Sequence, residues 1–302
     1  MIEGSVLYGE LAALATALFW SLTYVSFTIA VRLIGPRILN RLRLTLALVF
    51  LLITHLIVMG EPFPLHVELA RWGWLSLSGV IGFAIGDAML FRAFSSLGAH
   101  RSSLIMTLVP VTSALLAWVF LGEALEPLQV VAVLVTVAGI ALVVWRPGTS
   151  DKPLLLKRYR IGVLCAIGAV VTQSLRYIFC RQGMTGGFPP LSTNVVQIFA
   201  ATAAIWIWPV LKGQVRATFA ELHHRSACWA TIAGALSGPF IGVTLSLVAL
   251  RLAPVGLTST LMALSPVFLL PVSHFVLKER IDIRAIGGTV VAMIGAALIF
   301  LA

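Results

Sequence analysis

Two opposite charges interrupt an apolar stretch in the first third of the chain, FAIGDAMLFRA over residues 83–93. Asp87 is the only acidic residue well inside a stretch long enough to cross a membrane, and a carboxylate at that depth is costly unless it is paired, hydrated or neutralised. Arg92 follows about 140° further around a helix, so the two are poor partners within it, and Arg92 is placed to reach the membrane surface. Asp87 is therefore expected to face the protein interior, where it could titrate or bind a cationic group.

A second deep charge lies in the other half of the chain, Arg176 within TQSLRYIFC (172–180). We expect it to approach Asp87 across the middle of the protein. Aromatic and polar neighbours in the same two regions suit a metabolite cavity. The predicted substrate-binding or coupling residues are Asp87, Arg176, Arg92, Trp20, Tyr24, Gln173 and Tyr177. The alternative is structural: an ion pair that only docks helices, with interhelical hydrogen bonds from the polar neighbours.

The composition is that of a membrane protein. Hydrophobic residues make up 60% of the 302 residues and charged residues 11%, whereas a soluble domain has roughly 25% charged residues. The net charge of +10 comes from Lys and Arg in short clusters between apolar stretches, chiefly after the odd-numbered ones. This distribution is typical of loops on the cytoplasmic side and argues against nucleic-acid binding. The three cysteines have neither metal-site nor disulfide-framework spacing.

The apolar stretches predict ten membrane-spanning helices. Crossing about 30 Å of hydrocarbon takes roughly 20 residues of helix. The stretches that satisfy this length are 9–31, 42–60, 72–97, 102–121, 128–145, 161–181, 190–211, 227–250, 254–277 and 284–302. The longest connection, RPGTSDKPLLLKRYR, is rich in Pro, Gly and charge and is interpreted as a linker.

The two halves of the chain resemble each other. At a constant offset of 156, the segment 86–123 aligns with 242–279. The matched pairs are Gly82 with Gly238, Gly86 with Gly242, Pro110 with Pro266, Glu123 with Glu279 and Gly139 with Gly295. Nearer the start, Gly9 and SLTY (21–24) align with Gly162 and SLRY (174–177) at an offset of 153.

An odd number of spans per copy inserts the second copy upside down, which places a site between the copies near mid-bilayer. We therefore expect an all-α integral membrane fold of ten transmembrane helices in two inverted five-helix repeats. The expected boundaries are a first repeat at 1–146, a linker at 147–160 and a second repeat at 161–302.

Pro110 and Pro266 interrupt the fourth and ninth predicted spans. Each removes a backbone donor and releases the carbonyl four residues back. The two prolines are therefore candidate hinges. A fixed bend that shapes the bundle is the alternative.

The ends of the two copies share their Pro, Leu-x-Glu and Gly positions: SLIMTLVPVTSALLAWVFLGEALEPLQVVAVLVTVAGIALV (103–143) and STLMALSPVFLLPVSHFVLKERIDIRAIGGTVVAMIGAALI (259–299). Both resemble the end of an EamA-type repeat of the drug/metabolite transporter superfamily, and the resemblance covers nearly the whole chain. It implies a secondary active transporter that exports a small polar or amphipathic metabolite, such as an amino acid, by alternating access at a cavity between the repeats. Other members of the superfamily move nucleotide sugars or organic phosphates, so an exchanger of these compounds is the alternative that the resemblance leaves open.

An integral-membrane enzyme acting on a lipid-like substrate is the alternative from another class. Such sites gather several acids or histidines, whereas this chain has one deeply placed aspartate. We therefore expect no enzyme, no catalytic residue, no cofactor and no metal. The expected partners are a small-molecule substrate and the lipid bilayer, with Asp87 as the candidate for proton coupling. The expected state is a monomer or homodimer in the inner (plasma) membrane of a bacterium or archaeon.

Overall fold

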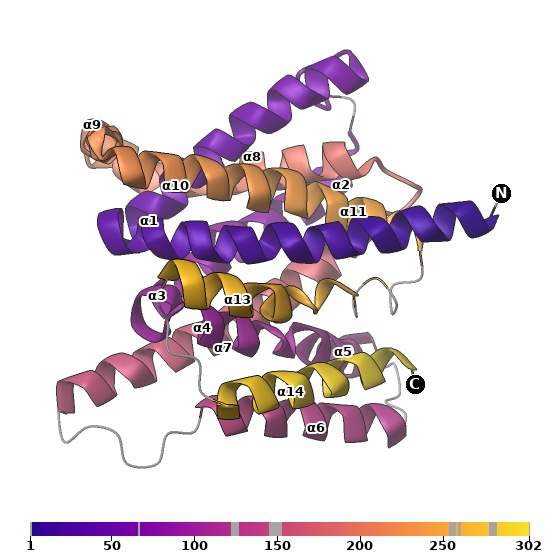
Figure 1. Ribbon diagram of the computed structural model, residues 1–302. Helices are drawn as coiled ribbons and strands as arrows, with labels where there is room; N and C mark the ends of the chain where they lie inside the picture. The colour runs from indigo at the N-terminus through magenta and orange to yellow at the C-terminus, as the bar shows by residue number, and fades with distance from the viewer. Residues whose placement is uncertain are drawn as a thin grey trace.

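The computed structural model is helical throughout its regular elements and describes residues 2–65, 67–121, 127–144, 153–253, 258, 261–277 and 283–301. Glu123 and Glu279 lie outside these residues. The first-half helices are α1 (Ile2–Met59), α2 (Leu69–Gly79), η1 (Val80–Gly86), α3 (Asp87–Leu97), α4 (Ala99–Met106), α5 (Leu108–Leu121) and α6 (Pro127–Val144). The later helices are α7 (Pro153–Gly183), α8 (Pro190–Leu211), α9 (Val215–Ala220), η2 (Glu221–His223), α10 (Arg225–Ala235), η3 (Leu236–Gly242), α11 (Val243–Leu252), α13 (Ser265–Leu277) and α14 (Ile283–Leu301). Figure 1 shows α1 lying beside α10 and α11, and α6 beside α14.

Several of these helices match the thickness of a bilayer. Among the described residues, five are long and apolar enough to cross one: Val6–Met59, Leu69–Leu97, Leu156–Gly183, Pro190–Leu211 and Arg225–Ala249. Shorter apolar helices accompany them at Val130–Ala141, Ser265–Leu277 and Ile286–Gly295. The chain is therefore a multi-pass integral membrane protein, and the count of ten spans stays a prediction.

The first two predicted spans are joined without a loop. α1 runs through the region 32–41 that the hydropathy pattern leaves between spans, and its one non-helical residue is Gly35 (φ 77°, ψ 163°). Glycine accepts this positive φ without a steric penalty, and Pro36 then suits the first turn of the helix that follows. Asn40 and Arg43 consequently lie on a helix inside the bundle and not at the end of a loop.

Other boundaries also differ from the sequence prediction. α7 begins at Pro153, so residues 153–160 of the expected linker are helical. The fourth and ninth predicted spans break just before their prolines, and α5 and α13 start at Leu108 and Ser265. Pro110 and Pro266 thus occupy the first turn of a helix, where a missing N–H removes no intrahelical hydrogen bond. Their role as hinges stays a prediction.

The first helix of each half packs antiparallel along the third span of the other half. In α7, Gly162 lies against Leu97 and the stem of Arg176 lies over Gly82. At the matched positions of the other copy, Gly9 lies against Ala253 and Thr23 lies over Gly238. Each contact therefore has a counterpart with the halves exchanged, which is the pattern of an isologous interface. A Cβ at any of these glycines would overlap its neighbour, so the helices can approach this closely only because the side chain is absent.

The last helices of the two halves make the same kind of contact with each other. Gly139 of α6 lies against Ala292 of α14, and Gly295 of α14 lies against Thr136 of α6. Residue 136 of α6 meets residue 295 of α14, and residue 139 meets residue 292. The two helices therefore run antiparallel, side by side (Figure 1). Here too the two contacts exchange places when the halves are exchanged.

We expect Gly139→Ala to destabilise the protein by about 1–3 kcal/mol, because its Cβ would meet the backbone of Ala292, which cannot swing aside. Gly287→Ala is the matched control: its Cβ meets nothing within 4 Å, so it should be neutral or stabilising by up to about 1 kcal/mol. Thermal unfolding in detergent, followed by tryptophan fluorescence, measures both. Equal melting temperatures for the two variants would contradict the packing described here.

Candidate functional site

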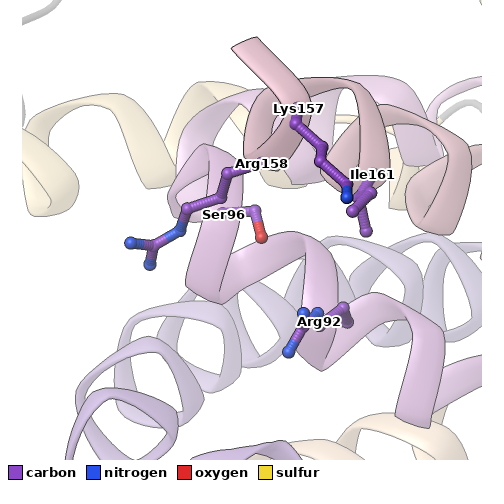
Figure 2. Close-up of a pocket in the computed structure, with 5 residues that line it drawn as sticks. All are labelled: Arg92, Ser96, Lys157, Arg158 and Ile161. Atoms are coloured by element: carbon purple, nitrogen blue, oxygen red, sulfur yellow. The ribbon is translucent and has the colours of Figure 1, made fainter. Parts of the chain in front are cut away.

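The two charges of FAIGDAMLFRA lie in different places. Arg92 is exposed and lines a pocket of about 340 Å³ with Ser96, Lys157, Arg158 and Ile161 (Figure 2). Asp87 is not among the lining residues of this pocket. The structure therefore separates Arg92 from the other predicted site residues, because five helical positions carry it to another face and nearer the helix end.

Asp87 forms an ion pair with Arg43, a residue that the sequence analysis did not select. Arg43 Nη2 donates to Asp87 Oδ2 at 2.5 Å, and the side chains are 2% and 15% exposed, respectively. Arg43 also donates to the Asn40 amide oxygen from Nε at 2.9 Å and from Nη2 at 2.8 Å, and to the Phe83 carbonyl at 3.1 Å. The predicted pairing of Asp87 with Arg176 is therefore corrected: the direct partner comes from the first half of the chain.

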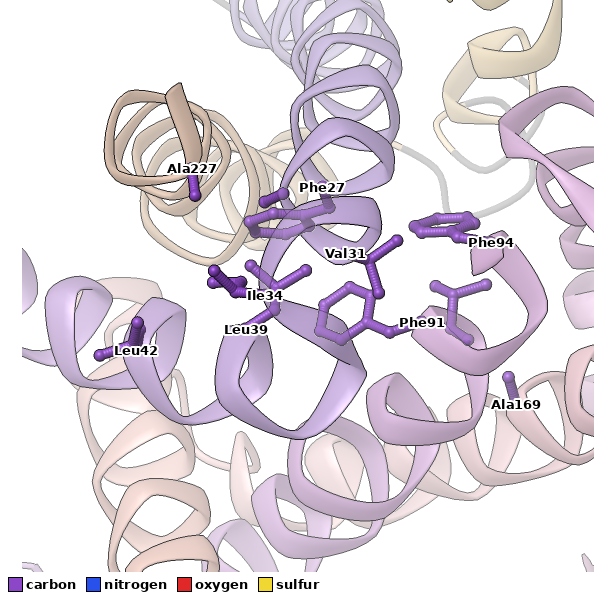
Figure 3. Close-up of a cluster of buried hydrophobic side chains, with 11 residues drawn as sticks. Phe27, Val31, Ile34, Leu39, Leu42, Phe91, Phe94, Ala169 and Ala227 are labelled. Atoms are coloured by element: carbon purple, nitrogen blue, oxygen red, sulfur yellow. The ribbon is translucent and has the colours of Figure 1, made fainter. Parts of the chain in front are cut away.

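Aromatic rings enclose this ion pair. The Arg43 guanidinium carbon lies 4.9 Å from the centre of the Phe91 ring and 5.6 Å from that of Phe27. The two rings meet edge to face, and both belong to the buried cluster around the kink of α1 (Figure 3). Cation–π contacts gain strength where water is excluded, so the rings add to the stabilisation that the ion pair and the hydrogen bonds give to the Arg43 guanidinium.

Arg176 is, with Arg43, one of two buried arginines among the described residues, and no described carboxylate forms an ion pair with it. Its side chain is 1% exposed; Nε donates to Gln173 Oε1 at 3.1 Å, and Nη1 lies 3.5 Å from Gln197 Oε1. Nη2 has no hydrogen-bond partner in the part of the chain that the structure describes. The guanidinium carbon lies 4.7 Å from the ring centre of Phe83 and 4.5 Å from that of Tyr177. The guanidinium therefore retains the capacity to donate to an anion.

The other predicted residues lie around these charges. The Tyr24 hydroxyl lies within electrostatic range of Asp87 and Tyr177, and Asp87 lies within electrostatic range of Arg176. Helices α1, α3 and α7 thus bring these four residues, with Gln173 beside them, into one cluster at the contact between the halves. Trp20, one turn before Tyr24 on α1, packs against Gly242 of the second half.

Each half holds a π-helix whose carbonyls are bonded by an asparagine. The segments η1 and η3 are offset by 156 residues, the offset of the sequence repeat. Asn40 Nδ2 donates to the carbonyls of Phe83 and Ala84 at 3.2 and 3.1 Å, and Asn194 Nδ2 donates to the carbonyl of Pro239, the match of Phe83, at 2.8 Å. Short π-helical segments occur often at functional sites. The matched positions of these two segments and their asparagine hydrogen bonds support a repeated architecture.

Sequence reasoning missed Arg43 and Asn40 because the hydropathy pattern begins the second span at residue 42. The available signal was their spacing: they are three positions apart, as are Asn194 and Gln197, two other buried polar residues. Gln197 Nε2 donates to Ser78 Oγ at 3.0 Å, and Asn194 Nδ2 donates to the Pro239 carbonyl of η3, so this second pair also makes hydrogen bonds between helices.

Comparison with known proteins connects this arrangement to a family. The model of the EamA-like transporter family matches the chain twice, at residues 7–145 and 160–301. A protein of Streptantibioticus cattleyicolor named as a probable terminal-alkyne amino-acid exporter is 25% identical over 205 residues, 68% of this chain and 64% of that protein. A crystal structure of another protein has the same fold, with a TM-score of 0.68 at 18% identity, covering 97% of this chain and 98% of that one.

We expect Arg43→Gln and Asp87→Asn each to destabilise the protein by roughly 3 kcal/mol, because each leaves an uncompensated charge among aromatic side chains. The double variant should lose less than the sum of the two, since it removes both charges together. Thermal unfolding of the four proteins of this cycle measures the coupling. Arg37→Gln, an exposed arginine on the same helix, is the control and should leave the melting temperature unchanged. Additive losses would mean that the pair contributes no coupling.

Proposed function

Because the chain belongs to the EamA-like transporter family, we propose that it is a secondary active exporter of a small polar or amphipathic metabolite, in the first place an amino acid. The observation that carries the proposal is the pair of buried arginines with a single carboxylate. Asp87 is held by Arg43, and Arg176 has a free donor at the contact between the halves. A carboxylate on the cargo would supply the missing acceptor.

The proposed transport mechanism is alternating access between two inverted five-helix repeats, residues 1–146 and 161–302, within ten spans. The exchanged contacts of Gly82 with Arg176 and of Gly238 with Thr23 support it. Two copies related in this way can adopt each other's conformations, and a site on their common axis then opens to either side in turn. An inner (plasma) membrane location is part of the same proposal.

Different parts of the cluster have different proposed roles. Arg176 binds the cargo carboxylate, and its guanidinium can present two parallel N–H donors to it. Tyr24, Tyr177 and Gln173 surround the bound group. Asp87 exchanges a proton: when the carboxylate is neutral, its attraction for Arg43 is lost, and the contact between α1 and α3 weakens. Protonation would thus be coupled to rearrangement of the first half.

Arg176→Gln should raise KM for a transported amino acid roughly tenfold to a hundredfold, since a charged hydrogen bond contributes about 1.5–3 kcal/mol. The corresponding amino-acid amide has no carboxylate, so its KM should change little. Counterflow of both compounds in proteoliposomes gives the comparison. Arg181→Gln, an exposed arginine on the same helix, is the control. An equal increase in KM for the amino acid and for its amide would assign Arg176 a structural role.

The exchanger alternative would be favoured if the wild-type protein transported no amino acid but showed counterflow of sugar nucleotides or organic phosphates. That alternative uses the same free donor, because an arginine binds phosphate as well as carboxylate.

Asp87→Asn should abolish accumulation driven by a proton gradient while leaving substrate counterflow in place, because exchange needs no net proton movement. Uptake is measured with and without an imposed pH difference across the liposome membrane. The Arg43→Gln/Asp87→Asn variant serves as a second test in which neither charge of this ion pair remains. Proton-driven accumulation that survives in both variants would remove Asp87 from coupling.

A further inference from the structure

Among the residues that the structure describes, the pocket that contains Arg92 is lined by three cations and by no acidic residue. Arg92 and Ser96 come from α3, and Lys157, Arg158 and Ile161 come from α7 (Figure 2). No Asp or Glu occurs between residues 88 and 122 or between 152 and 220. Asp151, six residues before Lys157, lies outside the described residues. The cavity of about 340 Å³ is large enough for a phosphate group and part of a headgroup.

The side chain of Arg158 links the two helices that form the pocket. Arg158 Nη2 donates to the Ser95 carbonyl at 2.6 Å, and Ser95 Oγ donates to the Arg92 carbonyl at 2.8 Å. The end of α3 is thereby fixed to the start of α7, and the walls of the pocket are fixed with it. Arg158 keeps its remaining guanidinium N–H groups for a further acceptor.

The repeat itself does not require these charges. The sequence offsets match Arg92 with Val248 and Ser96 with Leu252, and they match Lys157 and Arg158 with the uncharged residues 4 and 5. The corresponding positions of the other copy therefore carry no cation, although the same helices pack there through Gly9 and Ala253. The basic pocket is an addition to one copy.

An apolar stripe leads away from the pocket along α7. Lys157, Ile161, Leu164 and Val171 fall within an arc of about 80° on the helix. Leu164 is 67% exposed and Val171 39% exposed, so these two side chains point out of the bundle, whereas Gly168 between them is covered by Met89 of α3. A molecule with an anionic head in the pocket and an acyl chain along this stripe would satisfy both surfaces.

We propose that this pocket binds the phosphate of an anionic phospholipid headgroup. Basic pockets between membrane helices bind such headgroups, and arginine matches phosphate geometry with paired donors. The position fits: the pocket lies where α7 begins, on the side that the Lys and Arg distribution predicts to be cytoplasmic, where anionic lipids contribute a negative surface potential. The site is separate from the Asp87 cluster and does not depend on which cargo is transported.

The test uses the full-length protein in nanodiscs of phosphatidylcholine, with phosphatidylglycerol titrated as the probe and retained lipid measured by native mass spectrometry. The wild type should bind phosphatidylglycerol in preference to phosphatidylcholine. The triple variant Arg92→Gln, Lys157→Gln, Arg158→Gln should bind it roughly a hundredfold more weakly, since each basic side chain contributes about a tenfold factor or somewhat less.

A second triple variant removes the same number of positive charges at another place: Lys212→Gln, Arg216→Gln and Arg225→Gln. All three residues are exposed around the connection from α8 to α10. It should retain wild-type affinity. Because a triple substitution could disturb folding, melting temperatures are compared in phosphatidylcholine alone, and Arg92→Gln by itself provides a milder variant with a smaller loss.

Three results would overturn the proposal. The wild type shows no preference for phosphatidylglycerol, or both triple variants lose affinity equally, which would indicate a diffuse surface charge. In the third, millimolar inorganic phosphate displaces the lipid or raises the melting temperature as phosphatidylglycerol does, which would identify a free anion as the ligand. A preference that is lost only in the pocket variant and is insensitive to inorganic phosphate supports the lipid site.

Discussion

The close contact between the first helix of each half and the third span of the other half is the constraint on which the remaining structure depends. In a bilayer, apolar helices gain little by leaving lipid for one another, so association relies on tight packing and on polar contacts between helices. Gly82 and Gly238 provide the tight packing at matched places, and Arg176 and Thr23 lie over them. Each of these two contact regions therefore has a structural counterpart in the other.

A symmetric frame here carries an asymmetric set of charges. Arg43 and Asp87 pair inside the first half, whereas the position matched to Asp87 in the second half holds Val243. Arg176 stands where the other copy has a threonine. In the proposed mechanism, two similar halves can exchange conformations. The charges that differ between the halves would then bind the cargo and the proton. In the proposed transporter, the repeat thus supplies the motion and the departures from the repeat supply the selectivity.

Much of the organisation follows from the sequence because it depends on local or strictly repeated patterns. Long apolar stretches require helices in a bilayer, where no water can satisfy the backbone. The offset of 156 identified Gly82 with Gly238 and Gly139 with Gly295, and all four lie at close helix contacts. The rarity of charge inside these stretches singled out Asp87 and Arg176, and both lie at the contact between the halves.

The tertiary structure alone decided which groups meet. Hydropathy placed Arg43 at the edge of a span, but α1 continues through Gly35 and carries Arg43 into the bundle, where it displaces Arg176 as the partner of Asp87. The tertiary structure also places Arg92 with Lys157 and Arg158 in a separate pocket. A side chain's partner depends on the rotation of each helix and on the faces that neighbours present. These are set by packing across residues distant in sequence, whereas hydropathy records only how much of each helix must avoid water.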